Sequence, residues 1–209
     1  MDSRDDKAVT GGYVRPGCND GKTTDMPELT DLRVRLATPD DGADCAAIYT
    51  PIVEQTTTSF ELDPPTAAEM AERIEKALKK YPWLVCETMG NSAIPSRVVG
   101  YAYGTTWRAR PAYQWTVEVA IYVHEAWRGR GIGRALYGEL FERLRSQGFN
   151  MAVAGIALPN AESIGLHMAL GFRSVGVFHQ VGYKLGRWVD VAWFEREIQS
   201  PSGTADQLA

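Results

Sequence analysis

Residues 127–136 read Trp-Arg-Gly-Arg-Gly-Ile-Gly-Arg-Ala-Leu, with three glycines at alternate positions. This stretch follows an apolar, strand-like run at residues 117–123 and precedes a run with apolar residues at helical spacing. Alternate glycines let backbone N–H groups converge on an anion at the start of a helix, where the helix dipole also favours negative charge. The stretch therefore predicts a phosphate-binding turn, and an ordinary tight strand-to-helix loop is the alternative.

The spacing of these glycines argues against two common phosphate-binding motifs. A P-loop closes with Gly-Lys-Ser or Gly-Lys-Thr, but Gly133 is followed by Arg134 and Ala135, so no hydroxyl is placed for a magnesium ion. A dinucleotide turn needs a glycine at its sixth place, which here is Arg134 or Leu136. The next strand-like run, residues 151–157, also lacks the acidic residue that would bind a ribose. Neither a nucleoside triphosphate loop nor a dinucleotide site fits.

The composition is that of an ordinary globular protein. The 209 residues are 44% hydrophobic and 23% charged, which suits one domain with a substantial core. The formal net charge of −4 argues against nucleic acid as the main partner. No apolar run approaches the length of about 18 residues that a membrane span needs, so no membrane partner is expected.

The cysteines and the N-terminal residues indicate the expected compartment. Cys18, Cys45 and Cys86 are odd in number and lack the C-x-x-C spacing of a zinc site, so neither a disulfide framework nor a bound metal is expected. The acidic N-terminus does not have the pattern of a secretory signal. A cytoplasmic location is the simplest expectation.

The chain is expected to form one domain between two tails. Residues 1–31 are rich in Asp, Gly, Thr and Pro and show no apolar periodicity, which predicts a disordered extension. Residues 200–209 have a similar composition and are expected to form a flexible tail. Residues 32–199 contain no internal repeat and no long linker, which predicts a single compact unit.

Within this unit, strand-like and helix-like runs alternate. The helical runs carry apolar residues at helical spacing, and Thr66 with Glu69 forms a capping box. The expected helices are residues 39–53, 67–81, 132–145 and 161–170. The expected strands are residues 34–37, 84–88, 98–105, 116–123, 151–157, 173–177 and 189–198, and the second and third are expected to form a hairpin.

The glycine turn and the order of elements resemble the GNAT N-acetyltransferase family. Arg128-x-x-Gly131-x-Gly133 resembles the family's coenzyme A pyrophosphate turn, and the likeness in element order covers residues 33–198. It implies an α/β fold with a mixed, splayed sheet of about seven strands flanked by about four helices, and acetyl-CoA as the cosubstrate without a metal. The coenzyme residues implied are Ile121, Tyr122, Val123, Arg128, Gly129, Arg130, Gly131, Ile132, Gly133, Arg134, Asn160 and Ser163. In the family, a backbone N–H of the strand at 121–123 also stabilises the oxyanion.

Glu118 is the candidate general base. It is the only ionised residue in the run 115–123, and a carboxylate in an apolar central strand is costly unless it is paired or functional. Burial there would raise its pKa toward a value useful for taking a proton from an ammonium group. A structural ion pair is the alternative. The segment Trp-Thr-Val-Glu resembles the Trp-Thr-x-Glu of the phosphinothricin acetyltransferase subfamily, in which the matching glutamate is the proposed base.

His167 is the candidate for helping to protonate the leaving thiolate. Residues 160–172 contain Asn160-x-x-Ser163-x-x-x-His167 and end in Gly-Phe, which resembles the family's second coenzyme motif. The histidine is the form found in the phosphinothricin acetyltransferases. An ordinary, partly buried helical histidine is the alternative, and Asn160 is also a candidate N-cap for the helix that follows it.

The loop before the central strand resembles the acceptor side of the same subfamily. Residues 107–116 contain Trp-Arg-Ala-Arg-x-Ala-Tyr-x-Trp-Thr, which is close to the subfamily's Trp-Lys-Ala-Arg-x-Ala-Tyr-x-Trp-Thr, with Arg108 in place of the usual lysine. The likeness implies that Arg110 and Tyr113 bind a carboxylate or phosphinate, and that Phe60 lies in the other acceptor-side loop. Packing of the loop's aromatic residues under the sheet is the alternative.

These features predict an acetyl-CoA-dependent enzyme that acetylates the α-amino group of a small anionic amino-acid analogue by direct attack. Phosphinothricin, methionine sulfoximine and methionine sulfone fit the expected pocket. An acetyltransferase for ordinary amino acids or peptide N-termini is the first alternative, and a coenzyme A-binding regulatory module without turnover is the second. The C-terminal segment at 182–191 resembles the subfamily's final hairpin, which lies near a dimer interface, so a homodimer is expected.

Overall fold

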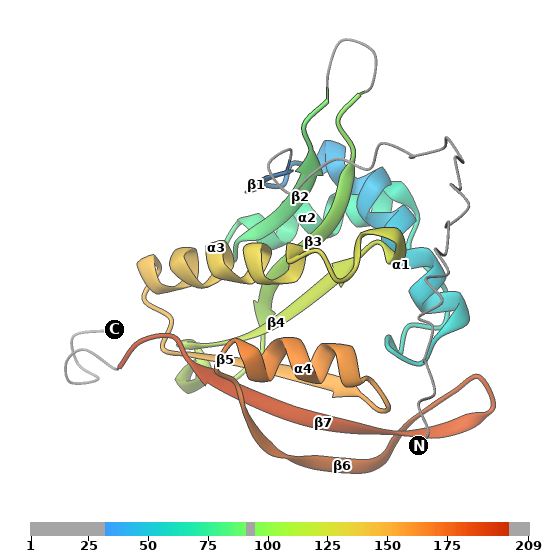
Figure 1. The fold of residues 1–209 in the computed structure, drawn as a ribbon. Coiled ribbons are helices and arrows are strands. Elements are labelled where there is room, and N and C mark those ends of the chain that lie inside the picture. The colour runs from blue at the N-terminus through green and yellow to red at the C-terminus, as the bar shows by residue number, and fades with distance from the viewer. Residues whose placement is uncertain (1–31, 91–94, 201–209) are drawn as a thin grey trace, which may run out of the picture.

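A computed structural model describes residues 32–90 and 95–200, which contain one seven-stranded mixed sheet and four α-helices (Figure 1). The predicted N-terminal extension, residues 1–31, and residues 201–209 of the predicted tail lie outside the described residues. The spatial order of the strands is β1-β2-β3-β4-β5-β7-β6. Their bounds are β1 Leu32–Leu36, β2 Trp83–Thr88, β3 Val98–Thr106, β4 Thr116–Val123, β5 Met151–Ala157, β6 Arg173–Lys184 and β7 Arg187–Glu197.

Three of the four helices begin at the predicted residues, and the first begins three residues later than predicted, after a 3-10 turn at Pro39–Asp41. Their bounds are α1 Gly42–Gln55, α2 Ala67–Leu78, α3 Ile132–Ser146 and α4 Ala161–Ala169. The Thr66 hydroxyl accepts from the Glu69 backbone N–H at 3.2 Å, and the Glu69 carboxylate accepts from the Thr66 N–H at 2.8 Å. This reciprocal pairing satisfies two backbone donors at the start of α2 and confirms the predicted capping box.

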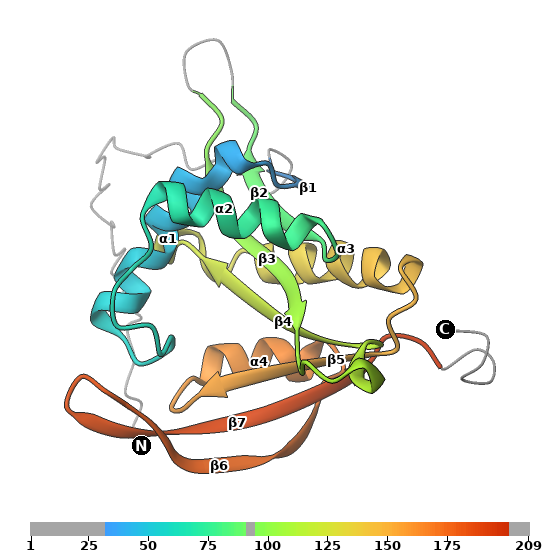
Figure 2. The same ribbon diagram turned by 180° about the vertical axis from the view of Figure 1, so that it is seen from behind.

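Helices cover both faces of the sheet and enclose two hydrophobic cores. Helices α3 and α4 lie in front of the sheet in Figure 1, and α1 and α2 lie in front of it in the reverse view of Figure 2. Alternate side chains of β4 face the layer of α3 and α4. Val117 and Val119 pack there in one cluster with Leu136, Leu140 and other side chains of α3. Glu118 lies between these two valines and therefore points to the opposite face.

The pairing of β4 with β5 is short, and this opens the sheet. The two strands are parallel neighbours only where Thr116–Glu118 faces Met151–Val153. Beyond Glu118, β4 pairs on its other side with β3 as far as Val123, while β5 pairs with β7 as far as Ala157. The sheet therefore splays from Glu118 onward, as the family resemblance implied.

The C-terminal hairpin is longer than the sequence indicated. Residues 173–177 and 189–198 were the predicted strands, but β6 runs for 12 residues and β7 for 11. The prediction was wrong because β6 is an edge strand exposed along almost its whole length, so no alternation of apolar and polar residues marks it. Register shifts in the β6–β7 pairing also interrupt any regular pattern.

Two further findings concern expectations from composition. Cys45 and Cys86 are free and buried, and Cys18 lies outside the described residues. None of the helices in the described ranges is long and apolar enough to cross a membrane.

Candidate active site

The glycine turn begins α3 as the sequence predicted. Gly131 is the N-cap of α3 with φ +79°, and Gly129 has φ +73°, conformations that side chains other than glycine rarely adopt. A Cβ added to either glycine would meet no atom within 4 Å, so backbone conformation rather than crowding demands glycine there. Gly133 differs, because its Cβ would lie 2.9 Å from a Leu166 methyl group of α4. The third glycine thus lets α3 and α4 approach closely.

The start of α3 has the properties of an anion site. No side chain caps its first backbone N–H groups, and the positive end of the helix dipole lies there. Arg128 and Arg134 are exposed beside the turn, while the Arg130 guanidinium lies 5.1 Å from the centre of the Trp127 ring. Arg128 also donates from Nε to the Val123 carbonyl at 3.4 Å, which ties the turn to the end of β4. These groups fit a pyrophosphate.

The splayed edge of β4 has free backbone groups for a second ligand segment. His124 donates its backbone N–H to the Val99 carbonyl of the neighbouring strand β3 at 2.9 Å. Because the direction of backbone groups alternates along an antiparallel strand, Tyr122 also directs its backbone groups to β3, whereas Ile121 and Val123 direct theirs to the open side. The Tyr122 ring packs on Tyr49, with centroids 4.8 Å apart. Of the three strand residues predicted for the coenzyme, Ile121 and Val123 therefore face the opening with their backbones.

Glu118 lies where the two strands separate. Its register partners are Thr105 on β3 and Val153 on β5, and its side chain is half-buried. Among the hydrogen bonds within the described ranges, none involves its carboxylate. Burial raises the pKa of Glu118 above the ordinary value of 4.5, and the positive charge of Arg108 opposes that rise. A carboxylate in this state is suited to accept a proton.

The loop between β3 and β4 brings basic and aromatic side chains to the same region. The Arg108 guanidinium lies 5.2 Å from the centre of the Trp107 ring, and the Trp107 and Tyr113 rings meet edge to face at 5.0 Å. Tyr113 is part of a short 3-10 turn, Pro111–Tyr113, and Arg110 precedes that turn on the exposed surface. Arg108 is thus the loop cation whose charge reaches Glu118.

On the Glu118 face of the sheet the structure has a cavity of about 520 Å³, and Glu118 itself is not one of the residues that line it. Thr116 and Val153, which line it, lie on the same face of the sheet as Glu118. Arg108 and Trp107 form one side of the cavity, and apolar residues of β6 and β7, including Trp193, form the other.

His167 is buried between α3 and α4, with 2% of its surface exposed. Its Nδ1 lies 2.7 Å from the Ser163 carbonyl oxygen, which only accepts, so Nδ1 carries the proton in the neutral ring. Its Nε2 then accepts from the Tyr137 hydroxyl at 3.1 Å. Burial lowers the pKa of His167, against the effect of the Ser163 hydrogen bond. The neutral ring thus has both nitrogens occupied.

The remaining predicted residues lie at the start of α4 and in the loop after α1. Asn160 is the N-cap of α4, because its side chain accepts from the Ser163 backbone N–H at 3.1 Å, which confirms the capping alternative for this residue. Phe60 is 41% exposed, and its ring lies against Gly182 of β6, where an added Cβ would come within 2.3 Å of the ring. The α1–α2 loop thus rests on the C-terminal hairpin.

The family follows from a comparison with known proteins. A family model described as an acetyltransferase (GNAT) domain matches residues 34–193. This chain belongs to the GNAT acetyltransferases. The α/β fold expected from the sequence is also that of its solved GNAT relatives.

Individual relatives match the GNAT chain over most of its length. It is 38% identical over 176 residues to the phosphinothricin N-acetyltransferase of Streptomyces viridochromogenes, which covers 84% of this chain and 93% of that protein. It is 38% identical over 171 residues to the L-methionine sulfoximine/L-methionine sulfone acetyltransferase of Salmonella typhimurium, which covers 80% of this chain and 95% of that protein. A phosphinothricin acetyltransferase from Sinorhizobium meliloti in complex with AcCoA has a TM-score of 0.75 and 35% identity, covering 83% of this chain and 92% of that one.

Three residues that contact the candidate site residues or their loops were not predicted from the sequence. Arg108 was noted only as a change from the lysine usual in the subfamily. Its position beside Arg110 in the basic loop was the signal that could have identified it. Tyr137 and Lys184 gave no signal, because their partners His167 and Ser59 lie 30 and 125 residues away in the chain.

Proposed function

We propose that this GNAT chain transfers the acetyl group of acetyl-CoA to the α-amino group of a small anionic amino-acid analogue. Phosphinothricin, methionine sulfoximine and methionine sulfone are the acceptors that the relatives' names suggest. The observation that carries the proposal is the position of Glu118, a half-buried and unpaired carboxylate within the described residues, where β4 and β5 separate and near Arg108.

The chain's own residues provide a place for the coenzyme. The pyrophosphate would bind the free N–H groups at the start of α3, with Arg128 and Arg134 beside it. The pantetheine arm would lie along the open edge of β4 and hydrogen-bond to the backbone of Ile121 and Val123. When bound there, acetyl-CoA supplies an activated acetyl group as a thioester.

Glu118 then acts as the general base. The α-ammonium of the acceptor gives a proton to the carboxylate, and the resulting amine attacks the acetyl carbonyl carbon. A strand N–H of β4 holds the negative charge that develops on the carbonyl oxygen. After the C–N bond forms, the C–S bond breaks, and the nitrogen loses its second proton while the leaving thiolate takes one up, so that the amide and the free thiol result.

Direct attack is favoured over an acetyl-cysteine route through either cysteine of the described residues. Cys45 and Cys86 are buried, with at most 1% of their surfaces exposed. Burial raises the pKa of Cys45 to about 12 and that of Cys86 to about 11, so neither thiol forms the thiolate needed for attack near neutral pH. Initial-rate kinetics should therefore follow a sequential pattern, and a ping-pong pattern would contradict this step.

We assign His167 a positioning role rather than direct protonation of the thiolate. The neutral ring has no N–H left to donate, since Nδ1–H binds the Ser163 carbonyl. The ring instead accepts from the Tyr137 hydroxyl and so fixes the contact between α4 and α3, the helix that begins at the glycine turn. His167→Asn should lower kcat more than it changes the KM for acetyl-CoA; equal effects on both would refute a part in the chemical step.

The acceptor's anionic group would bind the basic loop. Arg108 lies at the cavity beside Glu118, and Arg110 and Tyr113 lie on the exposed side of the same loop. A guanidinium group binds carboxylates and phosphinates through paired hydrogen bonds. A polycationic acceptor such as an aminoglycoside is disfavoured by these charges.

Release of free thiol from acetyl-CoA tests the proposal. We expect release with phosphinothricin, methionine sulfoximine or methionine sulfone and little with peptides. Release with peptides alone would overturn the acceptor class. Binding of acetyl-CoA with no turnover on any amine would favour a coenzyme A-binding regulatory module.

The cavity favours a second acceptor class, ordinary amino acids with a bulky apolar side chain. Its volume of about 520 Å³ has room for such a side chain, and Trp107, Val153 and Trp193 give it apolar walls. Val153→Trp would fill part of it. If apolar amino acids are the better acceptors, this change should lower their kcat/KM more than that of methionine sulfone.

We also propose that the chain forms a homodimer through the C-terminal hairpin. Large apolar side chains are exposed along it, including Val181, Tyr183, Leu185 and Trp188, each with more than half of its surface open. Such a patch is unusual on a monomer. Light scattering should give twice the mass of one chain for the wild type, and Val181→Lys should shift it toward the monomer. A monomeric wild type would contradict the proposal.

A further inference from the structure

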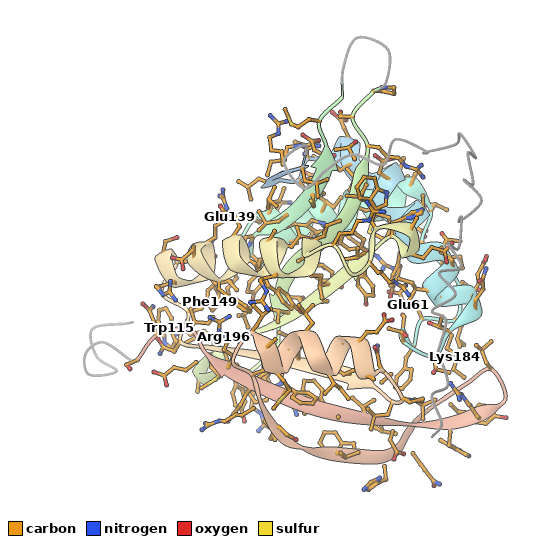
Figure 3. All side chains as sticks on the ribbon, in the orientation of Figure 1. Glu61, Trp115, Glu139, Phe149, Lys184 and Arg196 are labelled. Atoms are coloured by element: carbon orange, nitrogen blue, oxygen red, sulfur yellow. The ribbon has the colours of Figure 1, made fainter. Side chains whose placement is uncertain are left out.

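The tip of the β6–β7 hairpin holds the loop between α1 and α2 through three contacts. Lys184 donates from Nζ to the Ser59 carbonyl oxygen at 2.7 Å, and Arg187 donates to the Thr57 hydroxyl at 2.9 Å. The Phe60 ring lies directly on Gly182. Segments more than 120 residues apart in the chain thus meet at one place, and Figure 3 labels Lys184 on the hairpin and Glu61 on the loop.

Lys184 is a buried cation without a salt bridge among the described residues. Only 4% of its surface is exposed, yet no carboxylate among the described residues forms a salt bridge with its ammonium group. A buried ammonium group is costly without an opposite charge, and burial lowers the pKa of Lys184, while the charge of Glu61 opposes the shift. A methionine of similar length would fill the same space without this cost. The charge of Lys184 therefore calls for an explanation beyond packing.

The loop that Lys184 holds is fixed on its other side as well. The Ser59 hydroxyl lies 2.6 Å from the Tyr49 hydroxyl of α1 and accepts from the Glu61 backbone N–H at 3.1 Å. Glu61 in turn accepts from both ends of the Arg73 guanidinium at 2.8 and 2.9 Å. Phe60 lies between these two anchored residues and is the one large side chain of the segment 57–61 that is exposed. Its position therefore depends on how firmly Ser59 and Glu61 are held.

We propose that Lys184 is a positioning residue for the acceptor. By binding the Ser59 carbonyl it fixes Phe60, which the family resemblance assigns to the acceptor side. This inference rests on the proposed function, because it takes Phe60 and the loop at 57–61 as part of the acceptor site. The coenzyme turn at 128–134 lies on a different element and should not respond to Lys184.

The experiment compares Lys184→Met with the wild type in two independent measurements. The first is the KM for methionine sulfone, which should rise about tenfold in the variant while the KM for acetyl-CoA stays within twofold. The second is hydrogen exchange of the backbone amides at residues 57–62, which should become faster in the variant. Lys184→Arg keeps the charge and should recover part of the acceptor affinity. Lys76→Met, which removes an exposed lysine of α2, is the matched control and should change neither measurement.

The two measurements separate failure of the inference from failure of the proposed function. If the wild type acetylates no amine, the proposed function fails, and faster exchange at 57–62 in Lys184→Met still supports the contact's role in positioning. Unchanged exchange, or equal rises in KM for both substrates, would overturn the inference. If Lys184→Met does not fold, Arg187→Gln removes the neighbouring contact from an exposed side chain. Arg187→Gln should then raise the acceptor KM and speed exchange at 57–62, both by less than Lys184→Met would. An unchanged acceptor KM in Arg187→Gln would overturn the inference.

Discussion

Glu87 on β2 and Glu118 on β4 are two shielded carboxylates of the same sheet with opposite surroundings. Glu87 accepts hydrogen bonds from Arg33 and Arg35, and Arg35 also makes a two-pronged contact with Asp41 at 2.7 and 2.8 Å. Glu118 has no such partner within the described part of the chain, and Arg108 acts on it only through its charge. At β1 and β2 the carboxylates of Glu87 and Asp41 are paired with arginines, whereas on β4 the carboxylate of Glu118 has no hydrogen-bond partner within the described residues.

The pKa values of the two groups shift in opposite directions for this reason. Burial alone would raise the pKa of Glu87, but the hydrogen bonds from Arg35 and Arg33 outweigh it and hold the pKa below 4.5. Burial raises the pKa of Glu118, and only the positive charge of Arg108, which makes no hydrogen bond to the carboxylate, opposes it. A carboxylate held in its charged form stabilises the fold, whereas one that binds a proton more readily is suited to catalysis.

The largest expected effect is that of Glu118→Gln on turnover. Removing a general base should lower kcat by about 10²- to 10⁴-fold near neutral pH, while acetyl-CoA affinity stays nearly the same. The fold should be no less stable, because a neutral amide replaces a buried charge without a partner. Steady-state kinetics and thermal unfolding check both halves. Unchanged turnover would remove Glu118 from the mechanism.

Glu87→Gln should give the reverse pattern. It breaks the pairing with Arg33 and Arg35 and leaves their charges less compensated, so the free energy of unfolding should fall by about 2 kcal/mol. The kcat should stay within twofold, since Glu87 lies on the β1–β2 side of the sheet, away from the opening between β4 and β5. Chemical denaturation measures the first quantity. A large loss of kcat in the folded variant would show that the two regions are not independent.

Lowering the pH should affect activity before stability. Glu118 works as a carboxylate, so kcat/KM should fall as pH drops through its pKa, which lies above 4.5. Glu87 and Asp41 have lowered pKa values, so their contribution is complete above the unfolded values of 4.5 and 3.8 and is lost as pH falls below them. Rate and circular dichroism profiles over the same pH range should therefore separate. Simultaneous loss would contradict the contrast.

The sequence predicted the elements that carry one-sided or two-sided apolar patterns. The bounds of β4 and β5, Thr116–Val123 and Met151–Ala157, agree with the predicted ranges, and the residues of β5 are nearly all apolar because both of its faces are covered. The exposed edge strand β6 has no such pattern and was predicted at less than half its length.

The candidate site was predictable only where one short segment carries the signal. The glycine turn and Glu118 lie in such segments. The surroundings of His167 depend on Tyr137 in another helix, and the burial of Lys184 depends on the loop after α1. These contacts arise from tertiary packing, which local patterns do not encode.

The smallest expected effect concerns Arg108, the charge nearest to the open carboxylate. Arg108→Met should raise the KM for an anionic acceptor about tenfold, because the neighbouring guanidinium no longer attracts it. The same change removes the charge that holds down the pKa of Glu118, so the acid limb of the kcat/KM profile should move to higher pH. Arg108→Lys keeps the charge but not the paired hydrogen bonds, so the acid limb should stay in place and the acceptor KM should rise less than in Arg108→Met. Arg110→Met is the matched test of the sequence-based assignment, because Arg110 lies on the exposed side of the loop. If Arg110→Met raises the acceptor KM more than Arg108→Met and the acid limb stays in place, the acceptor binds on that exposed side rather than in the cavity beside Glu118.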